Sequence, residues 1–197
     1  MKHIQRVREF FQKTPVASLS SINLITKNKK YSYTLINHLT RKGEIKRITR
    51  GYYTIHDDPL LSVFCFRPSY IGLQDAMSIH NIWEQETCPV IITTKKVRNG
   101  SRTFLGCNAV IRRISKKYFF GIDYRKNGDF FFPVSDIEKT FIDMVYFNQI
   151  RRDTARKFTG RLNAAKLKEY LRKYDKRFSG RVMSFLDKKS CRKTRAK

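Results

Sequence analysis

The spacing of hydrophobic residues over the first quarter of the chain predicts three helices. Residues 4–12 and 19–25 place hydrophobic side chains at helical spacing, and a third helix is expected from about residue 30 to residue 42. Ser18 has the chemistry of an N-cap for the second helix. Gly43 is well placed as the left-handed stop of the third helix. Three closely spaced helices are therefore expected at the N-terminus.

Two short strands are expected after these helices. Residues 45–48 and 51–55 have strand composition and are joined at Thr49-Arg50. Three helices followed by a two-stranded ribbon is the element order of a winged helix-turn-helix, whose third helix can enter the major groove of DNA. Two aspartates precede Pro59 and favour a turn, so we expect the first domain to cover residues 1–56.

The middle of the chain predicts one helix and a small sheet. Residues 69–84 carry hydrophobic side chains at helical spacing and are expected to form an amphipathic helix. Asn99-Gly100 and Asn127-Gly128 are dipeptides typical of hairpin turns. The aromatic run Phe130-Phe131-Phe132 is too apolar to be left uncovered in a strand. The runs with strand composition are residues 89–94, 109–114, 118–122 and 130–134.

The last third of the chain predicts helices with basic outer faces. Ser135-Asp136-Ile137-Glu138 has the sequence of a capping box, with Ser135 as N-cap and Glu138 at N3. Two further helices are expected from the spacing of hydrophobic residues between 167 and 185. The expected fold class is α+β: an N-terminal winged helix-turn-helix, then an α+β domain over residues 60–187 with a small, mainly antiparallel sheet and C-terminal helices. A basic tail over residues 188–197 follows.

Composition adds a large positive charge that is unevenly distributed. The chain has 42 Lys plus Arg and 16 Asp plus Glu, for a net charge of +26, and its 41% of hydrophobic residues exclude a disordered polycation. Residues 1–56 carry 12 basic and 2 acidic side chains, residues 57–147 carry 12 and 10, and residues 148–197 carry 18 and 4. Two basic ends with a nearly neutral middle favour nucleic acid as the partner, ahead of an anionic membrane surface or an acidic protein.

The third helix and the ribbon carry the candidate contacts with double-stranded DNA. The amide of Asn37 can pair with an adenine edge, and Arg41 can reach guanine or phosphate. Basic and aromatic residues of the ribbon would contact phosphate or the minor groove. The residues expected to contact DNA are Lys29, Lys30, Ser32, Tyr33, Asn37, Thr40, Arg41, Arg47, Arg50 and Tyr52. A solvated helix in a protein-interaction domain is the alternative interpretation of this segment.

The sequence does not predict an enzyme, a metal site or a cofactor. Its four cysteines form no CxxC pair, and its four histidines do not fall at metal-ligand spacing. Asp136-Ile137-Glu138-Lys139 superficially resembles the end of a nuclease motif, but helix capping accounts for it. A P-loop, a glycine-rich dinucleotide turn and a nucleophile elbow are absent from the sequence.

The sequence also predicts a cytoplasmic protein. It has neither a secretory signal nor an apolar run long enough to span a bilayer, so we expect no membrane segment. The four cysteines, Cys65, Cys88, Cys107 and Cys191, are widely spaced and are expected to be reduced thiols.

Three segments, in order along the chain, resemble one protein family. They are Leu39–Tyr53 (LTRKGEIKRITRGYY), Ser69–Gln85 (SYIGLQDAMSIHNIWEQ) with the following strand PVIITT, and Val134–Asp143 (VSDIEKTFID). Together they are similar to the AbiEi-type antitoxins of type IV toxin–antitoxin systems, over residues 1 to about 187. The net charge of the last 50 residues, +14, is higher than the resemblance implies.

The resemblance implies a repressor that binds inverted repeats in its own promoter. It places Lys30, Tyr33, Asn37 and Arg41 on the recognition helix and Arg50 on the wing. It also implies a C-terminal domain that counters a toxin with a nucleotidyltransferase fold. The expected function is therefore an autoregulatory antitoxin. The alternative is an RNA- or ribosome-associated protein that binds through its basic C-terminal helices.

Overall fold

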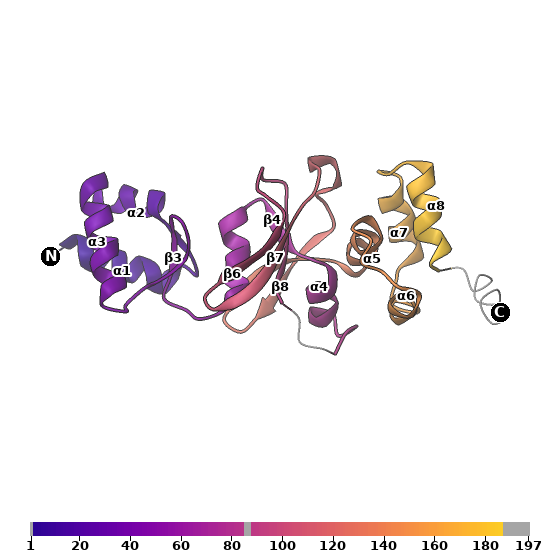
Figure 1. Ribbon diagram of the computed structural model, residues 1–197, viewed down its shortest axis with the longest axis horizontal. Helices are drawn as coiled ribbons and strands as arrows, with labels where there is room; N and C mark the ends of the chain where they lie inside the picture. Colours follow the sequence, from indigo (N-terminus) through magenta and orange to yellow (C-terminus); the bar gives the residue numbers. More distant parts are fainter. Residues whose placement is uncertain (1, 85–87, 187–197) are drawn as a thin grey trace.

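The computed structural model describes residues 2–84 and 88–186 (Figure 1). The N-terminal helices lie at one end of an elongated molecule, a β-sheet lies in the middle, and the C-terminal helices lie at the other end. The expected basic tail, with Cys191, lies outside the described residues. None of the helices in the described ranges is long and apolar enough to cross a membrane.

The N-terminal module, residues 2–56, combines three helices with a three-stranded antiparallel sheet. The strand order is β1-β3-β2. Its elements are α1 (Lys2–Lys13), β1 (Ala17–Ser18), α2 (Leu19–Thr26), α3 (Lys29–Arg41), β2 (Lys46–Thr49) and β3 (Tyr52–Thr54). The expected helices and the ribbon are present with nearly the expected bounds. The sequence missed β1, which pairs with β3 and adds the third strand.

Local signals in the sequence account for where these helices begin and end. The Ser18 hydroxyl accepts a hydrogen bond from the Ser21 backbone N–H at 3.0 Å, which confirms the expected N-cap of α2. Gly43 follows α3 at a φ of +71°, a left-handed conformation that glycine adopts at little cost. The Arg8 guanidinium binds the Glu44 carboxylate with two hydrogen bonds of 2.8 Å and lowers the pKa of that carboxyl. This pair connects α1 to the segment after α3.

A short 3₁₀-helical segment, η1 (Pro59–Phe66), lies between the N-terminal module and the central sheet (Figure 1). Asp58 caps it by accepting a hydrogen bond from the Leu60 N–H at 2.8 Å. Ile48 of β2 belongs to one hydrophobic cluster together with residues of η1 and of the sheet face that η1 covers. Tyr52 of β3 packs against that cluster. The apolar contacts therefore run from the N-terminal module into the middle of the molecule.

The central sheet has six strands in the order β6-β7-β5-β4-β9-β8. The strands are β4 (Ser69–Ile71), β5 (Val90–Thr93), β6 (Gly100–Phe104), β7 (Cys107–Arg113), β8 (Ile122–Asn127) and β9 (Phe130–Ser135). The pairs β4–β9 and β5–β7 are parallel, and the other three are antiparallel. The sheet is therefore mixed, where a mainly antiparallel sheet was expected.

Two of the segments predicted in this region have a different structure. Only Leu73–Ile79 of the expected helix over residues 69–84 is helical, as α4, because Ser69–Ile71 forms a buried strand between β5 and β9. Residues 118–122 were expected to be a strand, but η2 (Lys116–Tyr118) ends there, and β8 begins only at Ile122. Pairing with distant strands decided the first case against the local pattern.

The hairpins and the aromatic strand were predicted only in part. The expected hairpin between β8 and β9 is confirmed, but its loop residues are Gly128 and Asp129, because Asn127 is the last residue of β8 and pairs with Phe130. Asn99-Gly100 is not a turn, because Gly100 begins β6 and the Asn99 side chain accepts a hydrogen bond from the Arg113 N–H at 2.8 Å. In the aromatic strand, Phe132 is buried as expected, but Phe131 is 59% exposed.

Helices cover the other face of the sheet and form the far end of the molecule. They are α4, α5 (Ile137–Tyr146), α6 (Arg152–Lys157), α7 (Ala164–Leu171) and α8 (Lys176–Ser184). The two expected helices correspond to α7 and α8, and α6 was missed. Their shared core includes Tyr70 and Ile92 from the sheet and Phe141, Leu167 and Val182 from the helices. The N-cap of α5 is Asp136, which accepts a hydrogen bond from the Lys139 N–H at 2.7 Å, so the prediction of Ser135 as N-cap is wrong.

Candidate nucleic-acid interface

Helix α3 has one buried face and one exposed face. Leu35, Ile36 and Leu39 are at most 4% exposed and pack against α1 and α2. On the opposite side, Lys30, Asn37 and Arg41 are exposed. With about 3.6 residues per turn, spacings of seven and four residues place these three side chains in one row along the helix. The row combines two cations with an amide.

The remaining predicted residues of α3 differ in accessibility. Lys29, Tyr33 and Thr40 are exposed, although the Thr40 hydroxyl donates a hydrogen bond to the Ile36 carbonyl at 2.8 Å. The prediction for Ser32 is wrong, because its side chain is fully buried. Its hydroxyl lies 2.5 Å from the Thr26 hydroxyl and 3.0 Å from the Asn28 carbonyl. Ser32 holds the turn between α2 and α3 and does not belong to the exposed row.

The β2–β3 ribbon contributes two further cations. Arg47 and Arg50 are exposed, as expected for contacts with phosphate. Tyr52 is half-buried: it packs against the hydrophobic cluster beneath η1, and its ring lies 5.9 Å from the Lys95 Nζ. The ring of Tyr52 is therefore part of the junction with the central sheet, and the DNA contact expected for it is not favoured.

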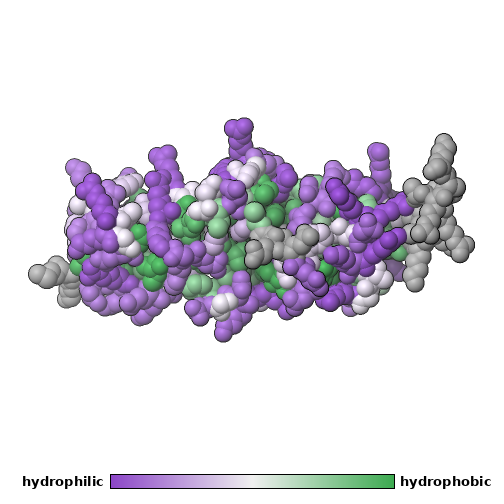
Figure 2. All heavy atoms as spheres, turned by 60° about the horizontal axis from the view of Figure 1, so that its bottom comes forward, coloured by the Kyte–Doolittle hydropathy of each residue, from purple (hydrophilic) through white to green (hydrophobic). Residues whose placement is uncertain are grey.

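The two carboxylates of the N-terminal module each have a partner outside the exposed row. Glu44 is paired with Arg8, and Glu9 accepts a hydrogen bond from the Gln5 side chain at 3.4 Å. Within the described part of the chain, Lys29, Lys30 and Arg41 form no ion pair. Their charges remain free to attract an anionic partner. Figure 2 shows one face of the molecule, on which hydrophilic side chains dominate both ends.

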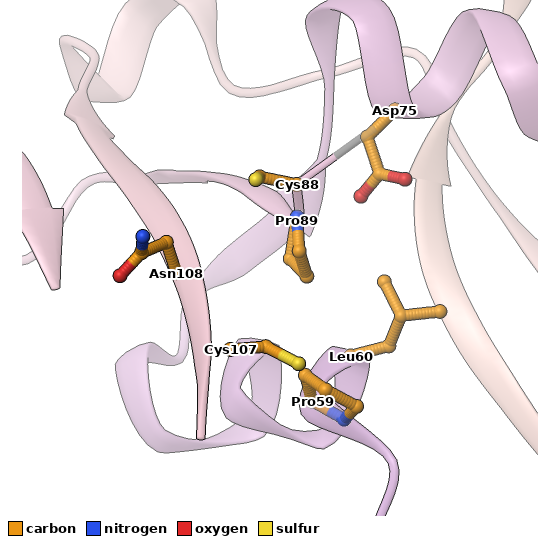
Figure 3. A pocket seen from close by; sticks show the side chains of 7 residues that line it. All are labelled: Pro59, Leu60, Asp75, Cys88, Pro89, Cys107 and Asn108. Carbon is orange, nitrogen blue, oxygen red and sulfur yellow. The ribbon is translucent and has the colours of Figure 1, made fainter. Parts of the chain in front are cut away.

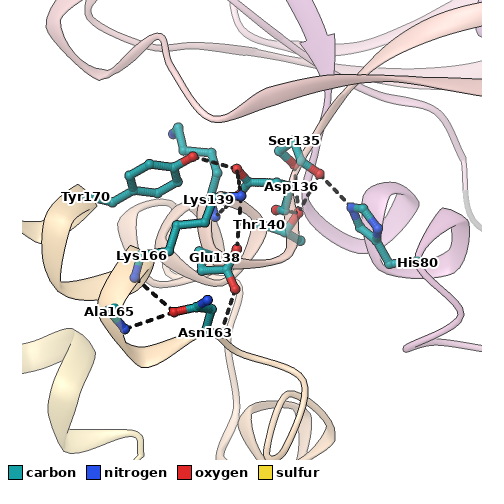
Figure 4. Close-up of polar contacts among 10 residues, drawn as sticks. All are labelled: His80, Ser135, Asp136, Glu138, Lys139, Thr140, Asn163, Ala165, Lys166 and Tyr170. Carbon is teal, nitrogen blue, oxygen red and sulfur yellow. Dashed lines mark hydrogen bonds and ion pairs between the residues drawn. The ribbon is translucent and has the colours of Figure 1, made fainter.

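The residues that resemble part of a nuclease motif form a structural network (Figure 4). The second carboxylate oxygen of Asp136 accepts a hydrogen bond from the Tyr170 hydroxyl at 2.7 Å and lies 3.0 Å from the Lys166 Nζ. Glu138 accepts a hydrogen bond from the Asn163 N–H at 2.7 Å and lies 3.5 Å from Lys166. Glu138 therefore joins α5 to α7, and its predicted role in a capping box at α5 is wrong.

A second, fully buried network lies beside the first. Lys139 and Asp143, one turn apart on α5, form an ion pair in which both side chains are 0% exposed. The other oxygen of Asp143 accepts a hydrogen bond from the Tyr70 hydroxyl at 2.7 Å. Burial raises the pKa of Asp143 and lowers the pKa of Lys139, because a low-dielectric interior disfavours both charged forms. These groups are enclosed, which suits a role in fixing α5 against β4.

Two cysteines line a pocket of about 470 Å³ between the start of η1 and the sheet (Figure 3). The Cys107 thiol points toward Pro59 and Leu60, whereas the Cys88 thiol points the other way, toward Asn108. Asp75 lies across the pocket and accepts a hydrogen bond from the Val90 N–H at 3.3 Å. Among the residues that the structure describes, no group of three or more His, Cys, Asp or Glu side chains is arranged to hold a metal ion.

Comparisons with known proteins do not assign the chain to a family. No protein-family model matches it, and a search of curated proteins finds no significant relative. Function is therefore argued from the chain's own residues.

Proposed function

We propose that the chain is a DNA-binding transcriptional regulator and that its N-terminal module is a winged helix-turn-helix. The observation that carries this proposal is the exposed row of Lys30, Asn37 and Arg41 on α3, a helix whose opposite face is buried. The absence of ion pairs at Lys30 and Arg41 within the described residues supports it further.

In this proposal α3 enters the major groove, which is wide enough for one helix. Asn37 supplies the donor and acceptor that match an adenine edge. Arg41 binds guanine or phosphate, and Lys30 binds phosphate. Arg47 and Arg50 on the β2–β3 ribbon bind phosphates of the DNA backbone beside the groove. The phosphate contacts provide most of the affinity, and the Asn37 and Arg41 contacts provide the base preference.

The resemblance to AbiEi-type antitoxins extends the proposal to an operator and a partner. The operator would be inverted repeats in the protein's own promoter. The partner would be a toxin with a nucleotidyltransferase fold, countered by the part of the chain that follows the N-terminal module. No individual residue of this chain is assigned to that second role.

RNA binding through the C-terminal helices is the second candidate function. Residues 151–186 carry 12 basic and 3 acidic side chains, which favours an anionic partner. Several of these cations have internal roles: Arg181 donates to the Val145 carbonyl at 2.6 Å, Arg161 donates to the His80 carbonyl at 3.1 Å, and Lys166 pairs with Asp136. Folding therefore accounts for part of the charge, and DNA binding by α3 is the stronger candidate.

A binding comparison with the full chain tests the proposal. The three ligands are a duplex from upstream of its own gene, a shuffled duplex of the same composition, and an RNA hairpin of similar length. We expect the upstream duplex to bind more tightly than the shuffled one by about 10³-fold, the low end for specific DNA-binding proteins. Equal binding of the two duplexes, or tighter binding of the RNA, would contradict the proposal.

A further inference from the structure

A pocket of about 520 Å³ opens beside the segment that joins η1 to β4. Its lining includes Phe64, Arg67, Phe119, Ile122, Tyr124 and Pro133. The volume lies in the range of pockets that hold small organic molecules. None of its lining residues belongs to α3, so the pocket has no part in the proposed contact with DNA.

The aromatic walls of this pocket are held in place by the core. Phe64 stacks on the fully buried Phe132, with 5.5 Å between ring centroids and 26° between ring planes. Phe119 packs against the fully buried Tyr70 at 5.5 Å. Two rings are therefore fixed before a ligand arrives, which reduces the entropic cost of binding.

A third ring stands at the mouth of the pocket. Tyr124 on β8 lies opposite Pro133 on β9 and is 70% exposed. Phe131, two residues before Pro133, shares this face of the sheet and is 59% exposed. Large aromatic side chains exposed together beside a hollow are typical of a binding surface.

The charge at the pocket is positive. The guanidinium carbon of Arg67 lies 4.8 Å from the centre of the Phe64 ring, and the side chain is exposed. Arg67 forms no ion pair within the described residues, and no carboxylate lines the pocket. Asp123, next to Tyr124, is not among the lining residues and forms no ion pair with Arg67. The positive charge also acts on the buried Cys65 thiol nearby. Burial raises the pKa of this thiol to about 12, and the charges of Lys95 and Arg67 partly oppose the rise because they favour the thiolate.

We propose that this pocket binds a nucleotide, with the base between the rings of Phe119 and Tyr124 and the phosphate on Arg67. A nucleotide joins a flat aromatic ring to an anion, which matches rings beside a single unpaired guanidinium. Bases stack on aromatic side chains, and a guanidinium binds phosphate through paired hydrogen bonds. A volume of about 520 Å³ suits a single mononucleotide better than a continuous strand.

Titration of the full chain with AMP, GMP, CMP, UMP and adenosine, monitored by calorimetry, tests this inference. We expect the purine nucleotides to bind most tightly, and adenosine to bind more weakly than AMP by about tenfold because it lacks the phosphate. Arg67→Ala should weaken AMP by about tenfold and leave adenosine unchanged. Tyr124→Ala should weaken AMP and adenosine alike, by about fivefold or more.

Arg125→Ala is the matched control, because Arg125 follows Tyr124 on β8 and does not line the pocket. It removes the same charge and should leave AMP binding unchanged. Lys30→Ala should also leave AMP binding unchanged, which separates this pocket from the proposed DNA site. The inference is overturned by an equal effect of Arg125→Ala and Arg67→Ala, by equal binding of AMP and adenosine, or by no binding at about 5 mM nucleotide. Much tighter binding of a short single-stranded oligonucleotide than of AMP would also overturn it.

Discussion

Replacing Asn37 with alanine is expected to remove the preference for adenine at one position of each half-site. A side-chain amide that pairs with the adenine edge contributes about 1–3 kcal/mol of discrimination. The variant should therefore bind the operator more weakly, while its binding to unrelated DNA stays the same, because Asn37 carries no charge. Asn37 lies between the two cations of the exposed row, where α3 would face the base edges.

Competition binding with a set of operator duplexes, each changed at one base pair, measures this effect. His38→Ala is a suitable control, because His38 is also exposed but lies about 100° further around the helix. The wild type and the His38→Ala control should show the same base preference at every operator position. Asn37→Ala should lose that preference at a single position. An unchanged profile for Asn37→Ala would mean that another residue reads the bases.

The Asp143→Ala variant is expected to lose about 3–5 kcal/mol of folding stability. The substitution leaves the Lys139 ammonium fully buried without its carboxylate partner, and it also removes the acceptor of the Tyr70 hydroxyl. Lys139 lies too deep to reach water, so its charge must be neutralised or exposed by unfolding. Urea denaturation of the full chain measures the loss.

Two further variants separate the ion pair from the packing around it. Tyr70→Phe keeps the ring and removes one hydrogen bond to a charged group, so it should cost about 1.5–3 kcal/mol. The double variant Lys139→Met with Asp143→Leu removes both charges and should be more stable than Asp143→Ala alone. A loss below about 1 kcal/mol for Asp143→Ala would contradict the role assigned to this pair.

The N-terminal module was predicted well because its signals are local. Ser18 and Gly43 mark helix ends through contacts with residues three or four positions away, and the hydrophobic spacing of α3 is strict. Ser32 was predicted to be an exposed DNA contact because a hydroxyl on a helix is usually exposed, but it is buried. Its partner Thr26 lies six residues away in another helix, and two mutually bonded hydroxyls can be buried at low cost.

The central sheet was predicted less well because its signals are non-local. Ser69–Ile71 has the pattern of a helix start, but β5 and β9 pair with it from 20 to more than 60 residues away. Glu138 satisfies the spacing of a capping box, yet it binds the backbone of Asn163, 25 positions later. The pocket around Arg67 was not foreseen either, because Phe64, Phe119 and Tyr124 come together only in the fold.

The salt dependence of DNA binding tests the central claim, that the exposed row on α3 contacts DNA, most directly. For a protein that contacts Z phosphates, the logarithm of the affinity falls with the logarithm of salt concentration with a slope of about −0.9Z. Lys30→Ala should flatten this slope by about one unit. Lys13→Ala removes the same charge from the last turn of α1 and should leave the slope unchanged. Equal slopes for wild type and Lys30→Ala, or an affinity insensitive to salt, would contradict the account.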